Sequence, residues 1–267
     1  MRKVLLATTA LVALNVSAAS ADISISGSAA FEIEDSGATT TYTSDGDIVI
    51  KGSSTTDSGL TLTAVQDLKF ENADVADSYI DIAGDFGSIR MGNTDNALDR
   101  MDGALPQNMD LEGVASSNVS GAIGTDEVGI SFMSPSFNGI TVYGNTTAEG
   151  ANTGVGANYK AGAMEIMIQS GSADQTAVAG KFSAGAVTVQ VGAVNVGSGA
   201  TKKEYRQVGA SYTMGDIKFI ATSQKEATNK YSNIGAKYTV APGLTVAAES
   251  GSQGSNNGTW VQVAVSF

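Results

Sequence analysis

The chain has no cysteine and no histidine, and only 3 of its 267 residues are proline. Without cysteine there is no disulfide scaffold and no thiol chemistry. Without histidine there is no Ser-His or Cys-His catalytic pair, and the commonest ligand of a catalytic zinc is missing. These absences argue against an enzyme.

Basic residues are also scarce. Lys and Arg number 15 against 27 Asp and Glu, so the formal net charge is -12. Without Arg2 and Lys3, which lie in the leader described next, 13 basic residues remain and the net charge becomes -14. A chain this acidic is not expected to bind nucleic acid, because binding to phosphates depends on neutralising them with Lys and Arg.

The first 21 residues have the layout of a secretory signal peptide. Met1-Arg2-Lys3 is a short basic segment, an apolar stretch runs from Val4 to about Val16, and Ala19-Ser20-Ala21 is a small-x-small cleavage site. We therefore expect residues 1–21 to be removed and residues 22–267 to form one domain.

Long apolar runs are absent after residue 21, where none approaches the roughly 18 residues of a membrane-spanning helix. What recurs instead is an alternation of apolar and polar residues. It is seen in "LTLTAV" (60–65), "YIDIAG" (79–84), "GSIRMG" (87–92), "MEIMIQ" (164–169), "VTVQVGA" (187–193) and the final "TWVQVAVSF". Successive strand residues point to opposite faces, so this period of two predicts strands along the whole chain.

The breaks between the alternating segments are of two kinds. Short ones, rich in Gly, Asp, Asn and Pro, are typical of hairpin turns and lie at 56–59, 84–87, 136–139, 160–162, 183–185, 214–216 and 241–243. Longer polar ones lie at about 35–46, 70–76, 94–124, 146–152, 171–175, 196–203, 224–230 and 250–258. This layout predicts an all-β, antiparallel, up-and-down transmembrane barrel of about 16 strands. The loosely alternating segments 47–53 and 174–183 leave 14 strands as the alternative.

The charged residues indicate which face of the strands meets lipid. Charges near the middle of strands are costly in a dry core but not in a water-filled lumen, so we expect the apolar face outside and the polar face inside. This places inside Glu32, Lys51, Asp67, Lys69, Asp81, Arg90, Glu165, Lys181, Lys218, Lys237 and Glu249. Aromatic residues near strand ends, suited to interfacial girdles, fall outside: Phe132, Tyr159, Phe182, Tyr212, Tyr238 and Phe267. The only tryptophan, Trp260, falls on the inward side.

Three segments carry a resemblance to a known family. They are the start "DISISGSAAFEI" (22–33), the segment "YIDIAGDFGSIRMGNTDNALD" (79–99) and the C-terminal strand ending in Phe267. The chain resembles the general porins of Gram-negative bacteria, and is most similar to the compact 16-stranded alphaproteobacterial type. The resemblance implies a homotrimer in the outer membrane, in contact with the lipid bilayer and lipopolysaccharide, that passes small hydrophilic solutes and ions. It also implies that Phe267 takes part in barrel closure and assembly.

The resemblance further implies a loop that folds into the barrel and narrows the pore. Here this constriction loop is residues 94–124, whose charged members are Asp95, Asp99, Arg100, Asp102, Asp110 and Glu112. The candidates for an opposing basic side are Lys51, Arg90, Lys218 and Lys237, of which Arg90 lies in the matched segment. Because carboxylates at a wet constriction attract cations, we expect weak cation selectivity.

Two alternatives accompany this reading. No cofactor is expected, but Asp95, Asp99 and Asp102 offer oxygen ligands that suit calcium, in a spacing that is not an EF-hand. The alternative function is a secreted structural protein or adhesin, rich in Gly, Ser and Thr and without a pore. Such a protein should show a fixed repeat length, whereas the spacing here is irregular.

Overall fold

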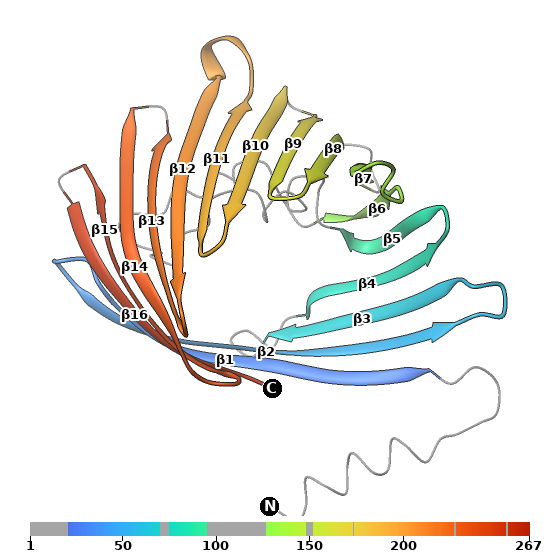
Figure 1. Ribbon diagram of the computed structural model, residues 1–267, viewed down its shortest axis with the longest axis horizontal. Coiled ribbons are helices and arrows are strands. Elements are labelled where there is room, and N and C mark those ends of the chain that lie inside the picture. Colours follow the sequence, from blue (N-terminus) through green and yellow to red (C-terminus); the bar gives the residue numbers. More distant parts are fainter. Residues whose placement is uncertain are drawn as a thin grey trace, which may run out of the picture.

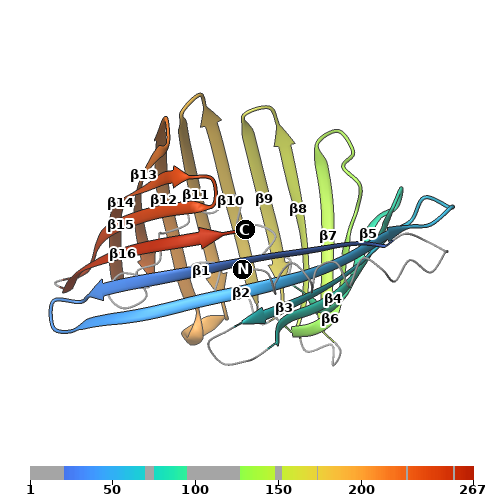
Figure 2. The same ribbon diagram turned by 90° about the horizontal axis from the view of Figure 1, so that it is seen from below.

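A computed structural model describes residues 21–69, 75–94, 127–147, 152–172, 174–226, 228–254 and 256–267. The predicted signal peptide therefore lies outside the described residues, apart from Ala21. The described strands form a closed antiparallel barrel of 16 strands, arranged in a ring in chain order (Figure 1; Figure 2 shows it from below). Their bounds are β1 Asp22–Asp35, β2 Thr40–Thr55, β3 Thr61–Lys69, β4 Val75–Gly84, β5 Gly87–Thr94, β6 Glu127–Met133, β7 Ile140–Thr147 and β8 Thr153–Ala161. The second half comprises β9 Met164–Gly171, β10 Gln175–Ala184, β11 Val187–Val196, β12 Lys203–Met214, β13 Ile217–Glu226, β14 Asn229–Ala241, β15 Leu244–Gln253 and β16 Asn256–Ser266.

The predicted up-and-down topology is confirmed. Each strand pairs with its neighbours in the chain, and β1 closes the ring by pairing with β16. The two loosely alternating segments are strands within β2 and β10, so the described part of the chain has 16 strands and not 14. Among the described residues no helix is long and apolar enough to cross a membrane.

The loop lengths differ from the prediction. The predicted short turns are present, and they define the short-turn end of the barrel, where β1 begins and β16 ends. At the opposite end, the loop end, several connections are shorter than predicted: β1 joins β2 through residues 36–39, β13 joins β14 through 227–228, and β15 joins β16 through 254–255. The reason is that backbone pairing continues through polar residues, as at Glu226 opposite Asn229. Apolar alternation marks only the part of a strand that contacts lipid.

The outer face is apolar and exposed. Ile23, Val128 and Ile168 have exposed fractions of 55%, 62% and 57%. Leaving such a side chain in water forgoes about 1.5–3 kcal/mol, so a barrel with this surface requires an apolar solvent. The aromatic residues expected at the interfaces all lie on this exposed face: Phe132, Tyr159, Phe182, Tyr212, Tyr238 and Phe267.

Trp260 lies on the inner face and is only 3% exposed. It sits directly opposite Glu34 on β1 and Glu249 on β15, and its ring forms a small buried cluster with Ala247. Partly buried Ile220 packs against this cluster. Trp260 is thus part of the inner wall and not of an aromatic girdle.

The two ends of the barrel chain meet at a seam between β1 and β16. Phe267 and Gly27 exchange two backbone hydrogen bonds, each with N and O 3.0 Å apart. A Cβ atom placed on Gly27 would lie 2.8 Å from Cζ of Phe267 and 2.8 Å from the carbonyl oxygen of Asp47 on β2. The seam therefore has room for glycine alone at this position.

Candidate functional site

The inner wall of the barrel is the candidate site. Because strand side chains alternate between two faces, every second residue points inward. The structure places on the inner wall all the charged residues predicted there from strands: Glu32, Lys51, Asp81, Arg90, Glu165, Lys181, Lys218, Lys237 and Glu249, together with Asp67 and Lys69.

Two of the predicted basic residues are direct neighbours. Lys218 on β13 lies opposite Lys237 on β14, and both side chains are exposed on the inner face. Directly opposite residues in an antiparallel pair have Cα atoms about 5 Å apart. Within the described ranges neither ammonium group forms a salt bridge. Lys51 lies elsewhere on the wall, on β2, opposite Ser24 and Val65.

Arg90 differs from these lysines because its charge is compensated nearby. Its Nε lies 2.9 Å from Asp81 Oδ1, and its second guanidinium contact to Asp81 Oδ2 is 3.0 Å. Its Cζ also lies 3.7 Å from the centre of the Tyr79 ring. Such a two-point pair fixes the guanidinium in place, so Arg90 adds less net positive charge than a lysine without a pair.

The predicted acidic residues of the wall have polar neighbours. Glu32, which is 7% exposed, accepts a hydrogen bond of 2.6 Å from Nε2 of Gln262. Glu165 lies between Lys160 and Lys181 on neighbouring strands and accepts a bond of 2.8 Å from Nδ2 of Asn158. Glu249 is 5% exposed, so it is held in the wall and not in open water.

The charges of the inner wall are partly ordered along the barrel axis, with Lys69 and Lys203 at the loop end and Glu165 near the short-turn end as exceptions. Lysines predominate near the short-turn end: Lys51, Lys160, Lys181, Lys218 and Lys237. Carboxylates predominate towards the loop end: Glu32, Asp45, Asp47, Asp67 and Glu226. The sequence places Lys160 in a predicted turn, Asp45 in a predicted loop and Asp47 at the start of the loosely alternating segment 47–53, so none of the three was predicted to face inward. Continuing the alternation from Tyr159 and from Ile48 would have found all three.

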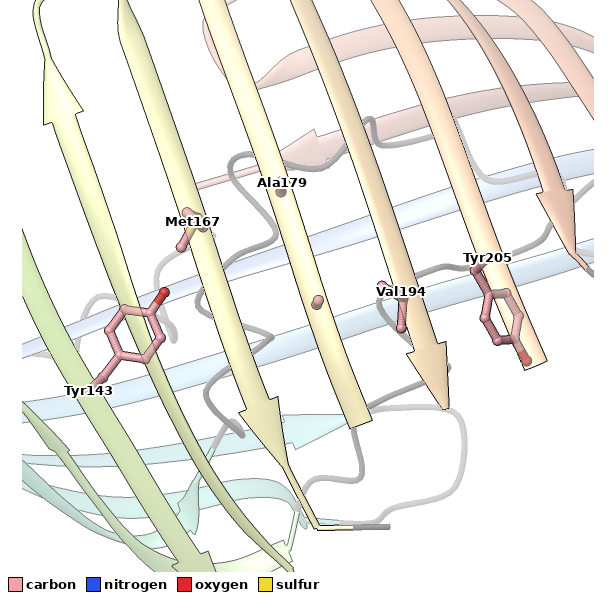
Figure 3. Close-up of a cluster of buried hydrophobic side chains, with 6 residues drawn as sticks. Tyr143, Met167, Ala179, Val194 and Tyr205 are labelled. Atoms are coloured by element: carbon pink, nitrogen blue, oxygen red, sulfur yellow. The ribbon is translucent and has the colours of Figure 1, made fainter. Parts of the chain in front are cut away.

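A buried apolar patch also lies on the inner face, across β7 to β12. It comprises Tyr143, Met167, Ala177, Ala179, Val194 and Tyr205, most of which are shown in Figure 3. Val194 and Met167 are only 1% and 2% exposed. These residues share the inward side of their strands with Gln169 and Gln207.

Apart from Thr94, which ends β5, the predicted constriction loop 94–124 lies outside the described residues, and with it Asp95, Asp99, Arg100, Asp102, Asp110 and Glu112. The calcium candidates Asp95, Asp99 and Asp102 are among these. In the described part of the chain, no group of three or more acidic residues is arranged to hold a metal ion.

Comparisons with known proteins agree with this architecture. The family model of the Gram-negative porins matches residues 7–267. No curated protein matches the sequence. A solved triple variant of the Rhodopseudomonas blastica porin is 20% identical, with a TM-score of 0.74 over 92% of this chain and 100% of that chain. The trimer form of OmpT, an outer membrane protein of Vibrio cholerae, is 12% identical, with a TM-score of 0.76 over 93% of this chain and 100% of that chain. At such identities the structures show likeness of fold alone.

A closed 16-stranded barrel with an apolar outer face and a charged inner wall defines an outer-membrane channel. The chain belongs to the Gram-negative porin family. It is a passive channel of the outer membrane and not an enzyme. The alternative of a secreted structural protein without a pore is not favoured.

Proposed function

We propose that this porin passes small hydrophilic solutes and ions with a weak preference for cations. The observation that carries the proposal is a charged inner wall of both signs inside an apolar outer face. Carboxylates towards the loop end raise the local concentration of cations. The lysines near the short-turn end, above all the neighbouring Lys218 and Lys237, oppose this and keep the preference weak.

The pore-narrowing role of residues 94–124 is the second part of the proposal. Tyr143, Met167 and Val194 are buried although they face inward, where an open lumen would expose them to water. A segment folded into the barrel would account for their burial. Residues 94–124 are proposed as this segment because they fall in the chain between β5 and β6, and β6 pairs with β7, where the patch begins. The acidic side chains Asp95, Asp99, Asp102, Asp110 and Glu112 would then face a basic side formed by Lys51, Lys218 and Lys237. Arg90 contributes less because Asp81 neutralises it.

The assembly is the third part. The similar OmpT structure is described as a trimer, and we propose that this chain forms a homotrimer embedded in the lipid bilayer. Lipopolysaccharide is proposed as the surrounding lipid of the outer leaflet. Phe267 is proposed to close and guide assembly of the barrel, consistent with its two backbone hydrogen bonds to Gly27. Passive diffusion needs no cofactor.

Selectivity is tested by the reversal potential of the refolded protein in a planar bilayer under a KCl gradient. We expect a reversal potential with the sign of a cation-selective pore. Its magnitude should be well below the Nernst potential of potassium, which an ideally cation-selective pore would reach. The preference should decline at high salt, because the Debye length falls from about 10 Å at 0.1 M to about 3 Å at 1 M. A potential of the opposite sign would contradict the proposed role of the carboxylates.

A further inference from the structure

In the described strands, the outer face carries a single group of basic side chains. Arg206 on β12 lies directly opposite Lys225 on β13, which lies directly opposite Lys230 on β14. All three are exposed. We name Arg206, Lys225 and Lys230 the cation row. Every other lysine and arginine in the described strands stands at an inward position, so these strands gather their outward-facing positive charge at one place.

The cation row has more positive charge than its neighbours neutralise. Like charges directly opposite each other on a sheet are destabilising unless an anion lies between them. The nearby outward carboxylate is Glu204, whose Oε1 lies 2.8 Å from Lys202 Nζ and whose Oε2 lies 3.6 Å from Arg206. Glu204 is therefore shared with a fourth cation, and the excess charge of the row remains.

The position of the row along the barrel points to the membrane surface. Below it, towards the short-turn end, β12 presents Val208, Ala210 and Tyr212 on the outer face. From Arg206 to Met214 a strand that rises about 3.4 Å per residue and tilts by about 40° climbs roughly 20 Å. Long basic side chains extend their charged ends further, into the headgroup region, as expected at the top of an apolar band about 25 Å tall.

We propose that the cation row binds the phosphate groups of lipopolysaccharide in the outer leaflet. The inference rests on the proposed outer-membrane surroundings, with the loop end on the extracellular side, because barrels of this kind have short periplasmic turns and longer extracellular loops. Guanidinium and ammonium groups are the side chains best suited to phosphate. Two interstrand spacings of about 4.8 Å separate the outermost members of the row. A headgroup that carries several phosphates on one rigid sugar backbone can contact more of the side chains in the cation row at once than a lipid with a single phosphate can.

The test compares two triple variants that each remove three positive charges. R206Q/K225Q/K230Q removes the cation row, and K160Q/K218Q/K237Q removes three lysines of the inner wall. Binding of purified lipopolysaccharide to the refolded proteins is measured in detergent without divalent cations, which could bridge it to carboxylates. Parallel titrations use lipopolysaccharide stripped of its phosphates and phosphatidylglycerol. Heat-modified gel mobility verifies that each variant is a folded barrel.

We expect the cation-row variant to bind lipopolysaccharide roughly tenfold or more weakly, because charge-assisted bonds to phosphate are lost. The inner-wall variant should bind like the wild type, and removal of the phosphates should abolish the difference. Equal binding by all three proteins would overturn the inference. The inference would also be overturned if the cation-row variant lost binding to phosphatidylglycerol only. A variant that kept lipid binding but no longer formed trimers would show instead that the row contacts a second copy of the chain. Binding of lipopolysaccharide is measured separately from conductance. A barrel that conducts no ions but still binds lipopolysaccharide through the cation row would therefore refute only the channel function.

Discussion

Replacing Gly27 with valine should sharply reduce the yield of folded barrel, whereas G52V should not. At Gly27 a new Cβ meets the backbone oxygen of Asp47 and the ring of Phe267, both at 2.8 Å. The ring can turn away, but the oxygen belongs to the backbone of β2, which pairs with the whole length of β1. At Gly52, also on the outer face but on β2, a Cβ would meet nothing within 4 Å.

We expect G27V to cost about 1–3 kcal/mol, the usual range for overpacking, because β1, β2 and the end of β16 must shift together. Valine at Gly52 is expected to be neutral or slightly stabilising, since it suits a half-exposed strand. The measurement is the folded fraction during urea titration, read from the mobility of unheated samples on gels. Equal midpoints for the two variants would show that the seam tolerates a side chain and that Phe267 is not tightly placed.

Reversing the paired lysines of the inner wall should strongly increase cation selectivity. The variant K218E/K237E replaces two neighbouring positive charges with two negative ones at the same place in the lumen. The matched control is K225E/K230E, which makes the same charge change on the same two strands, again at directly opposite positions, but on the outer face. Both variants change the net charge equally, so their difference reports which side chains line the ion path.

The expected result is a several-fold rise in the potassium-to-chloride permeability ratio for K218E/K237E, measured from reversal potentials near 0.1 M salt. At that salt the Debye length is about 10 Å, so charges act on ions passing the wall but not through the whole barrel. The control should stay close to wild type. Equal shifts in both variants would attribute selectivity to overall charge, and no shift in either would remove these lysines from the ion path.

Much of this fold could be predicted from the sequence because apolar alternation reports which face contacts lipid. That signal was enough for the strands that contain Ile23, Ile168 and Val263, and for the outward aromatic residues. It could not give register. Lys218 and Lys237 become neighbours because β13 and β14 join through only residues 227–228, where the sequence analysis expected a longer loop.

Contacts across the seam were beyond prediction for a related reason. Gly27 meets Phe267 only once the stagger of all the strands is set, and alternation carries no information about stagger. The pairing of Arg90 with Asp81 could have been predicted from the sequence, because the two residues lie on either side of the short turn that connects β4 to β5. Counting back from that turn places them opposite each other. The inner position of Trp260 followed from its parity, but its burial beside Ala247 depends on the neighbouring strand.

Single-channel conductance of the refolded wild-type protein in a planar bilayer tests the central claim most directly. A passive, water-filled channel should give open steps whose conductance grows in proportion to KCl concentration, and a trimer should close in three equal steps. Folded barrels, verified by gel mobility and inserted in the bilayer, that carry no current would contradict the account and leave a closed structural barrel in its place.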